Sequence, residues 1–332
     1  MKTINIDKLN LLLLLFSFVL ACFIPFELFL FAYAFLGPIH YLTETNWIRD
    51  KKYFVVNANW KYLVLASAFI YSIPFIASLS LFSEFFSESI IRFLTSDLVT
   101  YTNFLLFFIL IAAILSVFYK TFKALIISFF IALFIALWIY KTTTYILVIG
   151  LLLPTIIHVY LFTILFMIYG VRKSKSTFGI INVLLIIILP LTLFFLDTDF
   201  FNYNFSQTVK DNYVNNNFHF LNASLAKLFG FYNDLKFFFY EKVDLKIQIF
   251  ITFAYLYHYL NWFSKTTVIG WHKQLTTKKT IVIGSIWLLI ICCYLYNYRL
   301  GLILSIFLSI THVMLEFPLN IITIKSLFSK KK

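Results

Sequence analysis

Four histidines lie within apolar segments of the chain, and their side chains are the ones best suited to chemistry. They are His40, His158, His258 and His312. A histidine in such a segment faces the protein interior, where it is hydrogen-bonded or functional. Neutral imidazole binds iron, zinc, copper and nickel. We therefore expect the four side chains to meet and to hold one metal ion.

Two glutamates repeat the same spacing beside these histidines. Glu44 lies four residues after His40, and Glu316 lies four residues after His312. On a helix this spacing places both side chains on one face. A buried carboxylate needs a partner, and metal-bound imidazoles commonly donate their second N–H to a carboxylate. We expect both glutamates to support the ligands; for Glu44 the alternative is a solvated acid paired with Arg49.

Other polar and aromatic residues are weaker candidates for the metal site. His219 and His272 lie in polar connections and are expected to be ordinary surface residues. Asn261 and Trp262 follow His258, and anchoring at the membrane interface is the favoured role of Trp262. Five tyrosines near the histidines are expected to line a tunnel or simply to pack: Tyr41, Tyr160, Tyr255, Tyr257 and Tyr259.

The composition indicates an integral membrane protein. Of the 332 residues, 62% are hydrophobic and only 12% are charged, whereas about a quarter of the residues in a soluble domain are charged. We attribute the net charge of +13 to lysines in cytoplasmic loops, and therefore expect no nucleic-acid partner. Residues 1–332 are expected to form one domain embedded in a lipid bilayer, such as a bacterial inner membrane.

Apolar runs of about 20 residues, long enough to cross the hydrocarbon core, predict an all-α bundle of about nine transmembrane helices, within a range of eight to ten. The predicted spans lie near 10–36, 61–82, 102–119, 122–140, 145–169, 178–197, 246–263, 280–297 and 300–323. Lys and Arg are concentrated in alternate connections, which predicts an N-terminus outside and a C-terminus in the cytoplasm. Lys2 and Lys8 oppose this orientation. The four histidine-bearing spans then run in the same direction.

Two connections should lie outside the spans. Residues 198–245 are predicted to form an extracytoplasmic loop, with 211–217 irregular and 218–239 a candidate for a helix lying in the interface. Residues 40–60, rich in Trp and Tyr, are predicted to lie at the headgroup level. The sequence contains no Walker loop, GxGxxG, HExxH or nucleophile-elbow motif.

The surroundings of the four histidines resemble the Brp/Blh family, the bacterial and archaeal membrane β-carotene 15,15'-dioxygenases. The matching segments are Pro38-Ile39-His40 with Glu44, Ile156-Ile157-His158, Tyr257-His258, and His312-Val-Met-Leu-Glu316. Their order and spacing agree over about 270 residues. Thr163 stands where the family has an acid, and Glu44 stands where the family has Asp.

The resemblance implies a non-haem Fe(II) held by four histidines, with O2 and an apolar substrate such as a carotenoid as reactants. Two other classes remain open. A transporter or channel could use histidines at the membrane midplane to bind a metal or relay protons. A b-type haem protein would be favoured by facing histidine pairs, but the four histidines lie singly on four helices.

Overall fold

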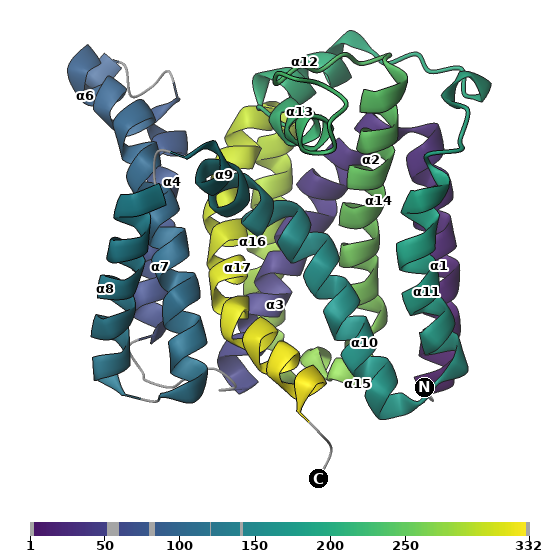
Figure 1. Cartoon of the computed structure of the whole chain (residues 1–332), viewed down its shortest axis with the longest axis horizontal. Coiled ribbons are helices and arrows are strands. Elements are labelled where there is room, and N and C mark those ends of the chain that lie inside the picture. Colours follow the sequence, from purple (N-terminus) through teal and green to yellow (C-terminus); the bar gives the residue numbers. More distant parts are fainter. Residues whose placement is uncertain (1–2, 52–59, 80–83, 120, 140–141, 330–332) are drawn as a thin grey trace. The chain divides into compact units, whose positions relative to one another are not determined.

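The computed structural model describes residues 3–51, 60–79, 84–119, 121–139 and 142–329, and within these ranges the chain forms helices and no strands (Figure 1). The first half contains α1 (Thr3–Phe23), α2 (Pro25–Phe31), η1 (Ala32–Leu36), α3 (Gly37–Lys51), α4 (Trp60–Ala77), α6 (Glu88–Arg92), η2 (Phe93–Asp97), α7 (Leu98–Phe118), α8 (Phe122–Ile139), α9 (Thr143–Tyr145) and η3 (Ile146–Phe162). The second half contains α10 (Thr163–Ser174), α11 (Thr177–Thr192), η4 (Thr198–Phe200), α12 (Gln207–Asn215), α13 (His219–Leu228), α14 (Lys242–Ser264), α15 (Thr266–Ile269), η5 (Trp271–Gln274), α16 (Thr277–Tyr296) and α17 (Tyr298–Phe328).

Seven helices in the described ranges are long and apolar enough to cross a membrane, which identifies an integral membrane protein. They are Asn5–Phe23, Pro25–Arg49, Trp60–Ala77, Glu88–Phe118, Thr143–Ser174, Thr277–Tyr296 and Tyr298–Phe328. Two further apolar helices, Lys123–Ile139 and Thr177–Thr192, are shorter. The predicted span 246–263 is helical as part of α14, but α14 is not among the seven apolar helices.

The predicted first span, 10–36, is wrong because the helix breaks between Phe23 and Pro25. Pro25 cannot donate a backbone hydrogen bond, and it occupies the first turn of α2, where that hydrogen is not needed. A side chain of α14 stabilises the break: the hydroxyl of Thr252 donates a hydrogen bond to the Pro25 carbonyl oxygen at 2.6 Å. The apolar run therefore forms α1 and a second helical stretch that carries His40.

Three predicted connections also differ from the structure. The segment between the predicted spans 61–82 and 102–119 was expected to be a connection, but a helix begins at Glu88 and continues to Phe118. In the segment 211–217, expected to be irregular, α12 extends to Asn215, while α13 occupies part of the predicted helical segment 218–239. Helix α3 continues to Lys51, so the predicted stretch 40–60 begins as helix; residues 52–59 lie outside the described ranges.

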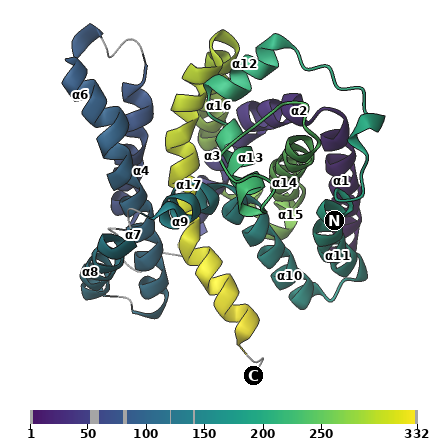
Figure 2. The same ribbon diagram turned by 45° about the horizontal axis from the view of Figure 1, so that its top comes forward.

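The chain divides into two compact units, and the division falls inside α3, η3 and α16. The first unit comprises Met1–His40 and Thr155–Ile281. Its central helix is α14, which packs against α1, α2 and α13, while α1 also packs against α11 (Figure 2). Most α14 side chains are buried, including His258. A helix surrounded by protein in this way needs less apolar surface than one facing lipid.

The second unit comprises Tyr41–Pro154 and Val282–Lys332. Helix α17 packs against α4 and α7, and α7 packs against α8. The turn between α16 and α17 is defined by Asn297, whose side chain caps α17 by accepting the Leu300 N–H. This unit contributes His312, in the middle of α17.

Candidate metal centre

Three of the predicted histidines, His40, His158 and His258, lie in the first unit and cluster around His258. Nε2 of His258 lies 3.0 Å from Nε2 of His40, and the ring centroids are 4.7 Å apart. The His158 ring centroid is 5.3 Å from that of His258. All three side chains are buried. The elements α3, η3 and α14 therefore bring three imidazoles into one apolar environment.

Two of these histidines follow or occupy π-helical segments. Segment η1 directly precedes α3, which carries Pro38 and His40, and η3 contains both Pro154 and His158. Proline lacks the backbone N–H of a regular helix, so it locally disturbs the hydrogen-bond ladder. Isolated π-helical turns occur frequently at functional sites. Pro154 thus lies inside irregular backbone, and Pro38 lies in α3 directly after such a segment.

His312 lies on α17 in the second unit, where an aromatic ring fixes its plane. The Tyr41 ring stacks on the His312 ring with a centroid distance of 4.4 Å and an interplanar angle of 23°. Tyr41 directly follows His40 on α3. The residue after the first histidine therefore contacts the last histidine.

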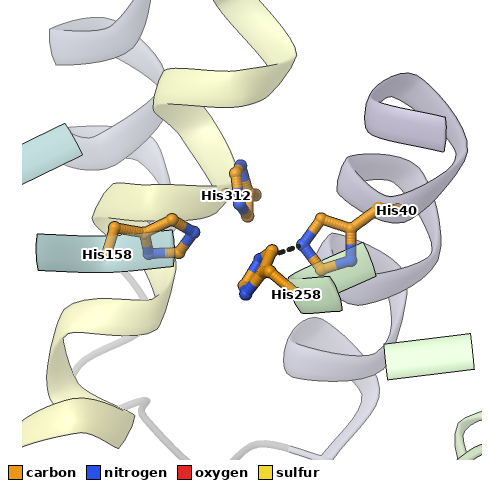
Figure 3. A group of neighbouring side chains, drawn as sticks. All are labelled: His40, His158, His258 and His312. Atoms are coloured by element: carbon orange, nitrogen blue, oxygen red, sulfur yellow. Dashed lines mark hydrogen bonds between the residues drawn. The ribbon is translucent and has the colours of Figure 1, made fainter. Parts of the chain in front are cut away.

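The four predicted histidines form one group of possible metal ligands. One ring nitrogen from each of His40, His158, His258 and His312 lies within 4.8 Å of the others. Figure 3 shows the four rings turned toward one another, with the His40–His258 contact drawn as a dashed line. Nitrogens bound to one metal at about 2.1 Å are at most about 4.2 Å apart. Ring movements of a few tenths of an ångström would bring the longest separation within that limit, so the four imidazoles could hold one metal ion.

Glu44 and Glu316 lie beside this group on α3 and α17. Each side chain is 3% exposed, so Glu44 is not the solvated acid considered as the alternative. Glu316 interacts with the Asn320 side chain, and the two carboxyl groups are close enough to repel each other. Arg49, the alternative partner of Glu44, donates to Asn46 at 2.9 Å. The structure thus places both predicted acids in the protein interior.

Aromatic side chains surround His40, but only some of the predicted tyrosines take part. Tyr259 and Trp262 lie 5.1 and 5.6 Å from the His40 ring, measured between centroids. Trp262 is buried and stacks on Trp271 at 6.0 Å, so it is an interior residue of the first unit. Its role as an anchor at the membrane interface stays a prediction.

The other predicted tyrosines of α14 and η3 make contacts elsewhere. The hydroxyl of Tyr160 donates to the Ile186 carbonyl at 2.7 Å, and that of Tyr257 lies 3.7 Å from Met167 Sδ. Tyr255 packs on Phe29. These three residues have structural partners away from the imidazoles.

The remaining histidines are separate from the metal group among the residues that the structure describes. His272 is exposed in η5, and His219 is partly buried at the start of α13. His272 therefore agrees with the prediction of an ordinary surface residue, whereas His219 is more buried than predicted.

Thr163 also contacts the histidine group, although the sequence indicated it only as a position where the chain differs from the Brp/Blh pattern. The hydroxyl of Thr163 lies 2.8 Å from Nδ1 of His258. The available signal in the sequence was its position five residues after His158. In an α-helix, residues five apart do not lie on the same face, so this spacing did not predict that His158 and Thr163 would both contact His258.

Comparisons with known proteins identify no relatives. No family model, curated protein or solved structure matches the chain.

Proposed function

We propose that this protein is a membrane-embedded non-haem iron oxygenase that acts on a carotenoid or a similar long apolar substrate. The group of four buried imidazoles carries this proposal. A resemblance to the Brp/Blh family at each of the four histidines supports the reaction class and suggests β-carotene cleavage to retinal. In this proposal His40, His158, His258 and His312 hold Fe(II).

The choice of iron rests on the resemblance together with the type of ligand. Neutral imidazole binds iron as well as zinc, copper and nickel, so the four histidines are compatible with Fe(II), and the Brp/Blh resemblance selects it among these metals. Bound Fe(II) would supply the binding and activation of O2.

The protein's own residues would orient the ligands and exclude water. Tyr41 holds the plane of His312, and Tyr259 and Trp262 cover the His40 ring. A dry, apolar environment strengthens electrostatic interactions and protects reactive species from hydrolysis. The repulsion between Glu44 and Glu316 would be offset by a cation at the histidine group.

The helix break at Pro25 suggests a revised membrane topology. It adds a crossing before His40, so we propose that the N-terminus lies in the cytoplasm together with the C-terminus. Lys2 and Lys8 then fall on the positive side of the membrane, removing the one charge conflict in the original assignment. The direction of the His40 helix is unchanged, and so is the expected location in a bacterial inner membrane.

Metal analysis of the purified protein tests the central part of the proposal. We expect about one iron per chain after anaerobic reconstitution with Fe(II). The His219→Ala variant should retain the iron, because His219 lies outside the group of four. A protein without bound metal, or with haem absorbance, would refute the proposed centre.

The substrate class requires a separate experiment. Expression in cells that produce β-carotene should lower the carotenoid content and yield retinal, and the His258→Ala variant should do neither. If iron is bound while carotenoid and product stay unchanged, the substrate assignment fails and the metal centre stands. Metal flux across vesicles containing the protein would instead favour the transporter hypothesis.

A further inference from the structure

Thr163 connects the helix that carries His158 to the His258 side chain. It is the first residue of α10, directly after η3, and it is 3% exposed. Its Oγ1 atom lies 2.7 Å from the Val159 carbonyl oxygen and 2.8 Å from Nδ1 of His258. All three residues belong to the first unit.

The hydrogen positions follow from the chemistry of these partners. A threonine hydroxyl has one hydrogen to donate and lone pairs to accept with, whereas a carbonyl oxygen can only accept. The hydroxyl hydrogen must therefore point to Val159, because two oxygens at 2.7 Å without a hydrogen between them would repel each other. The contact with His258 then requires that Nδ1 carries a hydrogen and donates it to Thr163.

We propose that Thr163 is a positioning residue that holds His258 as the Nδ1–H tautomer and leaves the lone pair on Nε2. That lone pair lies toward His40, whose Nε2 is 3.0 Å away. A metal ligand needs an unprotonated nitrogen, and a hydrogen bond to the opposite ring nitrogen fixes which one is available. This inference rests on the proposed metal centre for its functional meaning, but the tautomer assignment itself does not.

The role differs from that of the two glutamates. In addition to the two buried glutamates, a carboxylate here would bring a further negative charge into the membrane interior at considerable cost. A hydroxyl anchored by its own helix accepts the same imidazole hydrogen without introducing charge. Thr163 can therefore replace the acid that follows the second histidine in the Brp/Blh pattern.

The test compares Thr163→Val with Thr163→Ser in the full-length protein. Valine keeps the shape and removes the acceptor, whereas serine keeps the hydroxyl. Thr95→Val is a matched control, because Thr95 also bonds to the carbonyl four residues earlier, that of Ile91 at 2.8 Å. Loss of such an outer hydrogen bond lowers metal affinity by about 10- to 100-fold, so we expect that loss in Thr163→Val only.

Nitrogen-15 NMR of histidine-labelled, metal-free protein gives a readout that does not depend on metal binding. The His258 resonances, assigned by their absence from His258→Ala, should show the Nδ1–H form in the wild type and in Thr163→Ser. In Thr163→Val the two tautomers should mix. A wild-type His258 with its hydrogen on Nε2, or an unchanged tautomer and iron affinity in Thr163→Val, would overturn the inference.

The two proposals fail in different ways. If the wild type binds no iron but His258 has the Nδ1–H form and Thr163→Val loses it, the positioning role stands and the proposed function falls. If the wild type, Thr163→Val and Thr163→Ser all bind iron with equal affinity, the positioning role falls and the proposed metal centre stands. Should Thr163→Val not fold, Thr163→Ala provides the same loss of the acceptor with a smaller side chain.

Discussion

Gly301 on α17 allows a close approach of the Tyr294 ring, and a single methyl group there should destabilise the second unit. A Cβ atom placed on Gly301 would lie 2.3, 2.6 and 2.7 Å from three ring atoms of Tyr294. Carbon atoms in contact normally stay about 3.5–4.0 Å apart. The ring cannot turn away easily, because the Tyr294 hydroxyl is hydrogen-bonded to Ser305 at 2.6 Å and the side chain is buried.

Gly284→Ala provides the matched control and isolates this effect. Gly284 lies on α16, and a Cβ there meets no atom within 4 Å. Both substitutions gain about 1 kcal/mol of helix propensity, whereas only Gly301→Ala overpacks a buried contact, at about 1–3 kcal/mol. Because the closest of these contacts is more than 1 Å shorter than a normal one, we expect the difference in stability to lie near the upper end of this range, with Gly284→Ala the more stable variant.

The free energy of unfolding in detergent, measured for both variants by denaturant titration, tests this expectation. In a Tyr294→Ala background the Gly301→Ala substitution should lose most of its effect, giving a large coupling free energy between the two sites. Equal stability of the two glycine variants, or additive effects in the double variant, would refute the close packing of the Tyr294 ring on Gly301.

Three further predictions concern the site and its surroundings. His158→Ala should abolish iron binding while His219→Ala leaves it intact, as measured by metal content; equal loss in both would indicate misfolding. Tyr41→Leu should remove about 0.5–1.5 kcal/mol of stacking on His312 and weaken iron binding by up to about tenfold, while Tyr41→Phe should not; identical affinities would contradict the stacking. Burial lowers the pKa of Lys265 to about 8. Between pH 8 and about 10.5 the folded protein therefore loses this proton while the unfolded chain keeps it, so stability should rise with pH in this window. The rise, followed by thermal unfolding, should be smaller in Lys265→Met, and an equal rise would exclude this lysine as its source.

The sequence predicted those residues of the site whose polar side chains cost free energy when they are buried without a partner. His40, His158, His258 and His312 stand out because a polar imidazole in an apolar helix needs a partner, and the same reasoning selected Glu44 and Glu316. Their depth could be compared from the chain alone, because helices advance a fixed distance per residue. The identity of the metal and the substrate depends on chemistry that neither burial nor spacing specifies.

The missed features are local departures from regular helix geometry. Pro25 was a visible signal for a helix break, but the apolar run continues through it and hydropathy alone joined α1 to α2. Hydropathy placed the start of a predicted span near residue 102, whereas the helix that ends at Phe118 begins at Glu88. Thr163 was missed because its contact with His258 depends on the backbone of η3, and a π-helical segment has no clear sequence signature.

That π-helical backbone makes the number of residues between His158 and Thr163 part of the site. In an α-helix, five residues advance the direction of a side chain by about 140° beyond a full turn, whereas i→i+5 hydrogen bonds bring such residues nearly into line. His158 and Thr163 both contact His258, with a ring centroid distance of 5.3 Å and an oxygen–nitrogen distance of 2.8 Å. A one-residue deletion between them would turn one side chain away even if every remaining residue were kept. We therefore expect an insertion or deletion between His158 and Thr163 to disrupt this centre. A homologue with an α-helix here would need its hydrogen-bond acceptor three or four residues after the histidine.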